Sequence, residues 1–147
     1  MKSKYRLVLS LIATALWLWF IFARSLRDAN ASDAESGAVL ELIRKLLPFV
    51  TMHGVRKLAH FTEFFILGGL LFLDWRLWGR GGLWLPPAVG IAAAAADEFL
   101  QTSVPGRSGQ LSDVLLDFSG IACAGLIGLL FSRRKEKKTG GRRKETD

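Results

Sequence analysis

The 147-residue chain contains one cysteine, Cys123, which excludes an intrachain disulfide framework and a cysteine-based zinc knuckle. It also lacks a nucleophile elbow, an HExxH helix motif and a phosphate-binding P-loop, so no common catalytic signature identifies an enzyme. Half of the residues are hydrophobic, and the mean hydropathy is +0.28. This composition disfavours a disordered chain, a collagen and a soluble Rossmann or barrel enzyme.

Negative charge is the scarcer sign: 13 Asp and Glu face 20 Lys and Arg, which gives a formal net charge of +7. Such a balance is typical of nucleic-acid-binding proteins when the cations form a surface patch. Here eight of the twenty cations lie in the last 15 residues, directly after an apolar run. We therefore expect no nucleic-acid partner.

Four apolar segments approach the roughly 20 residues that a helix needs to cross a bilayer. They comprise residues 7–23, 58–73, 83–101 and 111–131. The sequence therefore predicts an all-α polytopic membrane protein, with a four-helix transmembrane bundle in residues 1–132. Gly120 and Ala124, four residues apart, favour close helix packing, and we expect the third and fourth segments to be tight neighbours. We expect residues 133–147 to form a basic, disordered cytoplasmic tail.

The distribution of Lys and Arg predicts the orientation, because short cytoplasmic loops carry an excess of these residues. Thirteen of the twenty cations lie on the side of the two termini if four segments cross. Both termini are therefore predicted to be cytoplasmic, and the first loop extracytoplasmic. In that loop Ser32 and Glu35 form a capping-box pattern, followed by Val39 and Ile43 at helical spacing. This pattern predicts an amphipathic helix in the first extracytoplasmic loop.

Ionisable side chains inside membrane spans are energetically costly and are functional candidates by default. In this sequence they follow helical spacing: Arg56, His60 and Glu63 share one stripe of the second segment. Carboxylates recur four residues apart at Asp113 and Asp117. The topology places all of these groups near the outer face. We predict one outward-opening site made of Arg56, Lys57, His60, Glu63, Asp97, Glu98, Gln101, Arg107, Asp113 and Asp117.

These residues also occur in three ordered sequence blocks. The blocks are Arg56-Lys57-x-Ala59-His60-Phe61-x-Glu63-Phe64, Asp97-Glu98-Phe99-x-Gln101 and Pro105-Gly106-Arg107-x-Gly109-x-x-x-Asp113-Val114-x-x-Asp117-x-x-Gly120. With them, residues 5–132 resemble the VanZ-like membrane protein family. The resemblance implies a multi-pass protein of the bacterial cytoplasmic membrane. The namesake of the family lowers susceptibility to the glycopeptide antibiotic teicoplanin by an undefined mechanism.

Three functions fit these residues, beside a purely structural or assembly role. The first is binding of an anionic envelope molecule, such as a lipid-linked cell-wall precursor, with Arg56, Lys57 and Arg107 as its anion ligands. The second is an intramembrane hydrolase or transferase. The third is a proton or ion relay in a small transporter. We favour the first and leave open whether the protein is an enzyme.

The enzyme alternative has its own candidate residues and cofactor. The catalytic candidates are His60, Glu63, Asp97 and Glu98. Glu63 is the candidate general base. No cofactor is required by the sequence, but carboxylates and a histidine are suitable ligands for a divalent cation. The expected partners are membrane lipids and a lipid-linked precursor.

Overall fold

The computed structural model describes residues 2–27, 29–45, 48–105 and 109–144, with side chains described in 4–27, 37–45, 48–105 and 109–131. Within these ranges the fold is all-helical, as predicted, and contains no strand. The helices are α1 (Lys2–Ser25), α2 (Ala29–Arg44), α3 (Met52–Trp78), α4 (Leu85–Thr102) and α5 (Leu111–Lys144).

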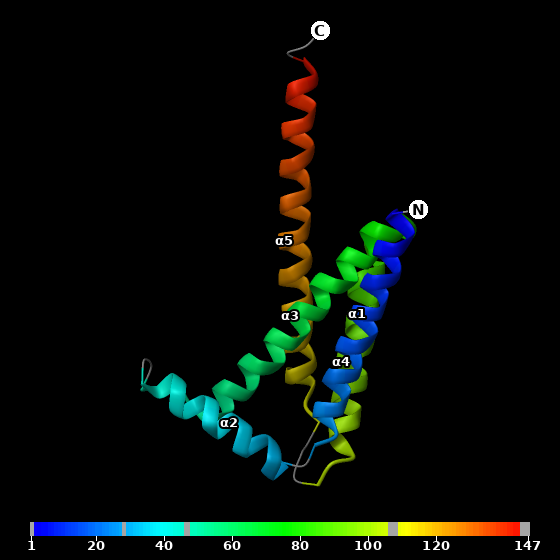
Figure 1. Ribbon diagram of the computed structural model, residues 1–147. Helices are drawn as coiled ribbons and strands as arrows, with labels where there is room; N and C mark the ends of the chain where they lie inside the picture. Colours follow the sequence, from blue (N-terminus) through cyan, green and yellow to red (C-terminus); the bar gives the residue numbers. More distant parts are fainter. Residues whose placement is uncertain (1, 28, 46–47, 106–108, 145–147) are drawn as a thin grey trace.

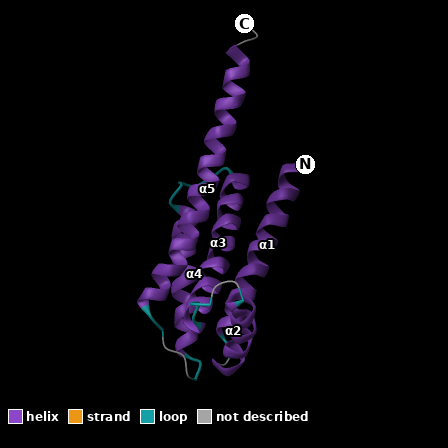
Figure 2. Ribbon diagram, turned by 90° about the vertical axis from the view of Figure 1, so that its left-hand side faces the viewer, coloured by secondary structure: helices purple, strands orange, loops and turns teal. Residues whose placement is uncertain are grey.

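Four of these helices, α1, α3, α4 and α5, run alternately down and up and pack side by side (Figures 1 and 2). α1 and α4 end, and α3 and α5 begin, at the lower end of Figure 1, which we call the polar end. The N-terminus and the α3–α4 connection lie at the opposite end. α2 lies across the polar end and packs against α3 (Figure 1). The order of the helices therefore brings four helix ends to one level.

The turn between α3 and α4 depends on glycine. Gly79 caps α3 with φ of 68°, and its N–H donates to the carbonyl of Trp75. Gly81 has φ of 83°. Both values lie in the left-handed region that glycine adopts without a steric penalty. Pro86 and Pro87 follow in the first turn of α4, where a missing N–H breaks no helical hydrogen bond.

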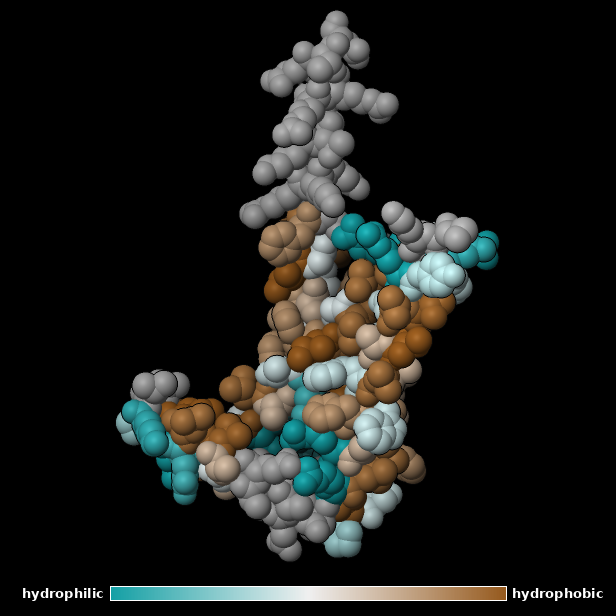
Figure 3. All heavy atoms as spheres, viewed as in Figure 1, coloured by the Kyte–Doolittle hydropathy of each residue, from teal (hydrophilic) through white to brown (hydrophobic). Residues whose placement is uncertain are grey.

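Three helices in the described part of the chain are long and apolar enough to cross a membrane. They are Lys4–Ser25, Met52–Trp78 and Leu111–Phe131. α4 has 18 residues but is not among them, because the polar residues near its end lower its hydropathy. Many apolar side chains on these helices are exposed, including Leu9, Trp19 and Leu115. Hydrophobic residues cover much of the outer surface in Figure 3, which is the pattern of a protein that faces lipid.

One sequence-based boundary needs correction. α2 begins at Ala29, so Ser32 lies inside the helix and is not its N-cap. α5 runs to Lys144 and so extends into the basic segment; that residues 133–147 form a separate, disordered tail stays a prediction. No proline interrupts α5, and Arg, Lys and Glu are good helix formers, so the helix has no local reason to stop near residue 132.

The closest helix approach among the described residues is between α5 and α3. α4 also packs against α5, in agreement with the predicted contact of the third and fourth segments, and a Cβ at Gly90 would lie 2.6 Å from Cδ1 of Ile121. A Cβ atom at Gly120 would lie 2.6 Å from the carbonyl oxygen of Phe61 and 2.9 Å from the backbone nitrogen of Phe65. On α3, a Cβ at Gly68 would lie 2.7 Å from the Cα of Ile121. Glycine on both helices therefore permits backbone contact. The core around this crossing contains Ile21, Phe64, Leu67, Leu71, Ala93, Ala94 and Ile121.

We predict that Gly120→Ala destabilises the folded protein by about 1–3 kcal/mol, because the added methyl group overlaps the backbone of α3. Gly69→Ala is the matched control, since a Cβ there meets nothing within 4 Å. The free energy of unfolding in mild detergent measures both changes. Equal stability of the two variants would contradict the close α3–α5 contact.

Candidate functional site

Asp97 is a fully buried side chain of the polar end, with 0% of its surface exposed. It lies in the last turns of α4, where α1 also ends. The hydroxyl of Ser25 donates to its Oδ1 at 2.5 Å, and Nε2 of Gln101 donates to its Oδ2 at 2.9 Å. Hydrogen bonds from two helices therefore fix the orientation of this carboxylate.

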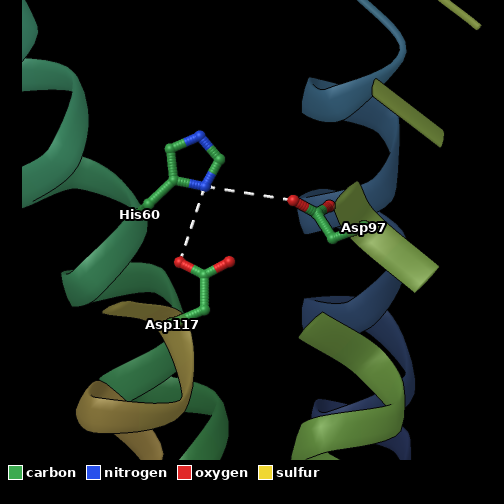
Figure 4. Close-up of side chains that lie close together, drawn as sticks. All are labelled: His60, Asp97 and Asp117. Atoms are coloured by element: carbon green, nitrogen blue, oxygen red, sulfur yellow. Dashed lines mark ion pairs between the residues drawn. The ribbon is translucent and has the colours of Figure 1, made fainter. Parts of the chain in front are cut away.

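His60 and Asp117 meet Asp97 from two other helices (Figure 4). Nδ1 of His60, on α3, lies 3.9 Å from Oδ2 of Asp97 and 3.8 Å from Oδ1 of Asp117. Asp117, on α5, is also 0% exposed. One ligand atom from each of the three residues lies within 4.8 Å of the others. We call His60, Asp97 and Asp117 the buried triad.

Glu98, the neighbour of Asp97 on α4, binds the backbone of the next connection. Its Oε1 accepts a hydrogen bond from the N–H of Gln110 at 2.5 Å. Gln110 directly precedes α5, and its carbonyl accepts the N–H of Asp113 at 2.9 Å. Glu98 thereby holds the start of the helix that carries Asp117.

Glu63 lies on the side of α3 that faces α1. Its Oε1 is 3.2 Å from Nε of Arg24, and its backbone carbonyl accepts a hydrogen bond from Nε1 of Trp17 at 2.9 Å. Arg24 and Glu63 line a groove of about 630 Å³ between α1, α2 and α3. The rest of the lining is mainly apolar and includes Phe20, Val39 and Leu58. The groove thus combines an apolar wall with one ion pair.

The remaining predicted residues take separate positions around the triad. Lys57 pairs with Asp113 at 3.3 Å, which joins α3 to the first turn of α5. Arg56 is half-buried on α3. Arg107 lies outside the described residues. The structure therefore brings His60, Asp97, Gln101 and Asp117 into one cluster, while Glu63, Glu98 and Asp113 engage other partners beside it.

Sequence reasoning missed Arg24 and Ser25 as site residues, because they follow the first apolar run and resemble ordinary flanking residues. It also missed Asp74, which is buried in α3 towards the other end of the bundle. The hydroxyl of Thr14 lies 2.6 Å from Oδ2 of Asp74 and 3.1 Å from the Ser10 carbonyl, and its single hydrogen serves one acceptor at a time. Thr14 and Asp74 line an otherwise apolar cavity of about 390 Å³. The available sequence signal for Asp74 was a single Asp directly after the apolar segment 58–73.

The fold and the polar end define a class: an all-helical membrane protein with ionisable side chains collected where its helices end. The chain belongs to the VanZ/LLP1 family, whose family model matches residues 10–132. This match confirms the resemblance seen in the three sequence blocks. No curated protein and no solved structure matches the chain.

We predict that Glu98→Leu increases amide hydrogen exchange at residues 109–113, because the N–H of Gln110 loses its carboxylate acceptor. Glu98→Gln retains an acceptor oxygen of the same reach and serves as the control, with exchange close to that of the wild type. Mass-spectrometric exchange in detergent measures this difference. Unchanged exchange in Glu98→Leu would contradict the role of Glu98 in holding the start of α5.

Proposed function

We propose that this protein of the bacterial cell envelope binds the anionic headgroup of a lipid or lipid-linked molecule at its polar end. The observation that supports this function most is the groove of about 630 Å³ between α1, α2 and α3. Its apolar wall suits an acyl or polyprenyl chain, and Arg24 suits a phosphate or carboxylate. A lipid or lipid-linked molecule has the matching combination of an apolar chain and an anionic headgroup.

Arg24 has the properties that such recognition requires. Its guanidinium carries five N–H donors in a planar fork, and it engages Glu63 through Nε. The side chain is 36% exposed, so it is accessible to a ligand in the groove. Glu63 and the hydrogen bond from Trp17 to the Glu63 carbonyl hold the two helices in register beside it.

We also propose that all four antiparallel helices cross the cytoplasmic membrane, with both termini in the cytoplasm. α4 has 18 residues and therefore spans about 27 Å, close to the thickness of the hydrocarbon layer. Its polar residues face the bundle: Asp97, Glu98 and Gln101 are all buried. The bias of Lys and Arg then makes the polar end extracytoplasmic. At the opposite end, Trp75, Trp78 and Trp84 suit an aromatic belt at the inner interface.

Reporter fusions test this orientation. Fusions after residues 30 and 106 are expected to report an extracytoplasmic position, and a fusion after residue 79 a cytoplasmic one. If the fusions after residues 79 and 106 report the same side, α4 does not cross the membrane. A cytoplasmic signal after residue 30 would reverse the orientation and contradict an outward-facing site.

The family context adds an expected consequence for the cell. The namesake of the resembled family lowers susceptibility to a glycopeptide antibiotic, and binding of an envelope precursor at the extracytoplasmic face is a route to such an effect. We therefore propose an effect on glycopeptide susceptibility. The second candidate function is an intramembrane hydrolase or transferase. The buried triad favours it, because a histidine beside two carboxylates is a suitable acid–base or metal-binding set.

We predict that Arg24→Ala lowers the affinity for an anionic lipid roughly 10- to 100-fold, since a hydrogen bond to a charged group contributes about 1.5–3 kcal/mol. Native mass spectrometry of the detergent-solubilised protein with phosphatidylglycerol measures the affinity. Phosphatidylcholine has similar acyl chains but no net negative charge, so its binding reports the contribution of the apolar wall.

Arg27→Ala is the matched control, because it removes the same charge three residues further on but does not line the groove. It is expected to retain the wild-type affinity. Equal losses in Arg24→Ala and Arg27→Ala would indicate unspecific charge attraction and would contradict a site at Arg24.

A further inference from the structure

We propose that His60, Asp97 and Asp117 bind one divalent metal ion, with Zn²⁺ as the best match. Each residue comes from a different helix, α3, α4 and α5, and the three side chains point toward a common centre (Figure 4). The metal site adds a cation to the binding function proposed for the polar end. Binding of the ion needs only the three side chains and does not depend on that function.

The distances suit a metal ion better than direct hydrogen bonding. The His60 nitrogen lies 3.9 and 3.8 Å from the two carboxylate oxygens, beyond the reach of a hydrogen bond. Two atoms that each contact a zinc ion at about 2.0–2.2 Å lie about 3–4 Å from each other. All three ligand atoms fall within 4.8 Å of one another. Because two ligands of a tetrahedral zinc ion lie about 3.4 Å apart, side-chain rotations that move the ligand atoms by up to about 1.4 Å complete the coordination.

The two buried carboxylates of this centre favour a bound cation. Asp97 and Asp117 are both 0% exposed. Among the residues that the structure describes, neither oxygen of Asp117 has a hydrogen-bond partner. The other carboxylates of the polar end differ, because Glu63 pairs with Arg24 and Asp113 with Lys57. A buried carboxylate without a hydrogen-bond partner is energetically costly, and a bound cation at this centre compensates the charge of Asp117.

The surroundings of Asp97 match those of a metal ligand. Ser25 and Gln101 donate hydrogen bonds to its two oxygens. Metal-binding carboxylates commonly have such outer partners, which orient the ligand. A carboxylate oxygen has two lone pairs, so one oxygen can accept a hydrogen bond and also bind a metal ion. α1, which supplies no ligand, thus contributes to the site through Ser25.

The donor set selects the metal. One imidazole nitrogen with two carboxylate oxygens suits Zn²⁺, whereas Mg²⁺ and Ca²⁺ prefer sites made of oxygen alone. Three protein ligands leave one position of a tetrahedral ion open. That position would accept water or an oxygen of the anionic headgroup that we propose as the ligand. Coordination by an oxygen of the anionic ligand rests on the proposed lipid-binding function. Binding of the metal ion by the triad does not.

Zinc titration of the full-length protein tests the site. The protein is extracted in mild detergent, stripped with a chelator and titrated with ZnCl₂ alone in a calorimeter. We expect one zinc per chain, and an affinity at least roughly 100-fold lower in Asp117→Asn, which removes a ligand charge but keeps the shape. Asp113→Asn, one helical turn earlier on α5, removes the same charge outside the triad and should retain the wild-type affinity.

Thermal unfolding keeps the result interpretable if a variant folds poorly. Zinc should raise the midpoint of the wild type and of Asp113→Asn, but not that of Asp117→Asn or His60→Ala. The proposal is overturned if the stripped wild type takes up no zinc, if Asp117→Asn binds with wild-type affinity, or if Asp113→Asn loses as much as Asp117→Asn. Arg24→Ala should bind zinc normally. Loss of lipid binding with intact zinc binding would contradict only the lipid-binding proposal. Loss of zinc binding with intact lipid binding would contradict only the metal-site proposal.

Discussion

A buried carboxylate inside a lipid-facing bundle has no water to solvate it, so neighbouring side chains must do so. Asp97 imposes this requirement on the whole polar end. Its oxygens accept hydrogen bonds from Ser25 of α1 and Gln101 of α4, and His60 of α3 lies beside it. The ends of these helices must therefore meet at one level.

The close contact of α3 with α5 provides the other half of this arrangement. Gly120 lies against the backbone of Phe61, the residue after His60, and it follows Asp117 by three residues on α5. The backbone approach that Gly120 permits therefore sets the distance between His60 and Asp117. A larger residue at this position would separate the two helices and open the triad. The helix contact at Gly120 and the position of Asp117 in the triad thus depend on the same turn of α5.

Helical periodicity predicted part of this site, because the spacing of Asp97 with Gln101 follows from 3.6 residues per turn. Glu63, which shares a stripe with His60 in the sequence, instead pairs with Arg24 outside the triad. The helix class, the family and the close packing of Gly120 also followed from the sequence. Periodicity does not specify which helices face each other, so Arg24 and Ser25 were missed as site residues, and the contact of Gly120 with α3 was not foreseen. Hydropathy predicted four spans, yet α4 is less apolar than the others because it carries the buried polar groups.

The account depends most directly on the bond between Ser25 and Asp97, because it joins the first helix to the cluster. A double-mutant cycle of Ser25→Ala and Asp97→Asn, measured by unfolding in mild detergent, gives the coupling energy of this pair. We expect a coupling of about 1 kcal/mol or more, the contribution of a hydrogen bond to a charged acceptor. Additive effects, within about 0.3–0.5 kcal/mol, would show that Asp97 does not hold the helices together.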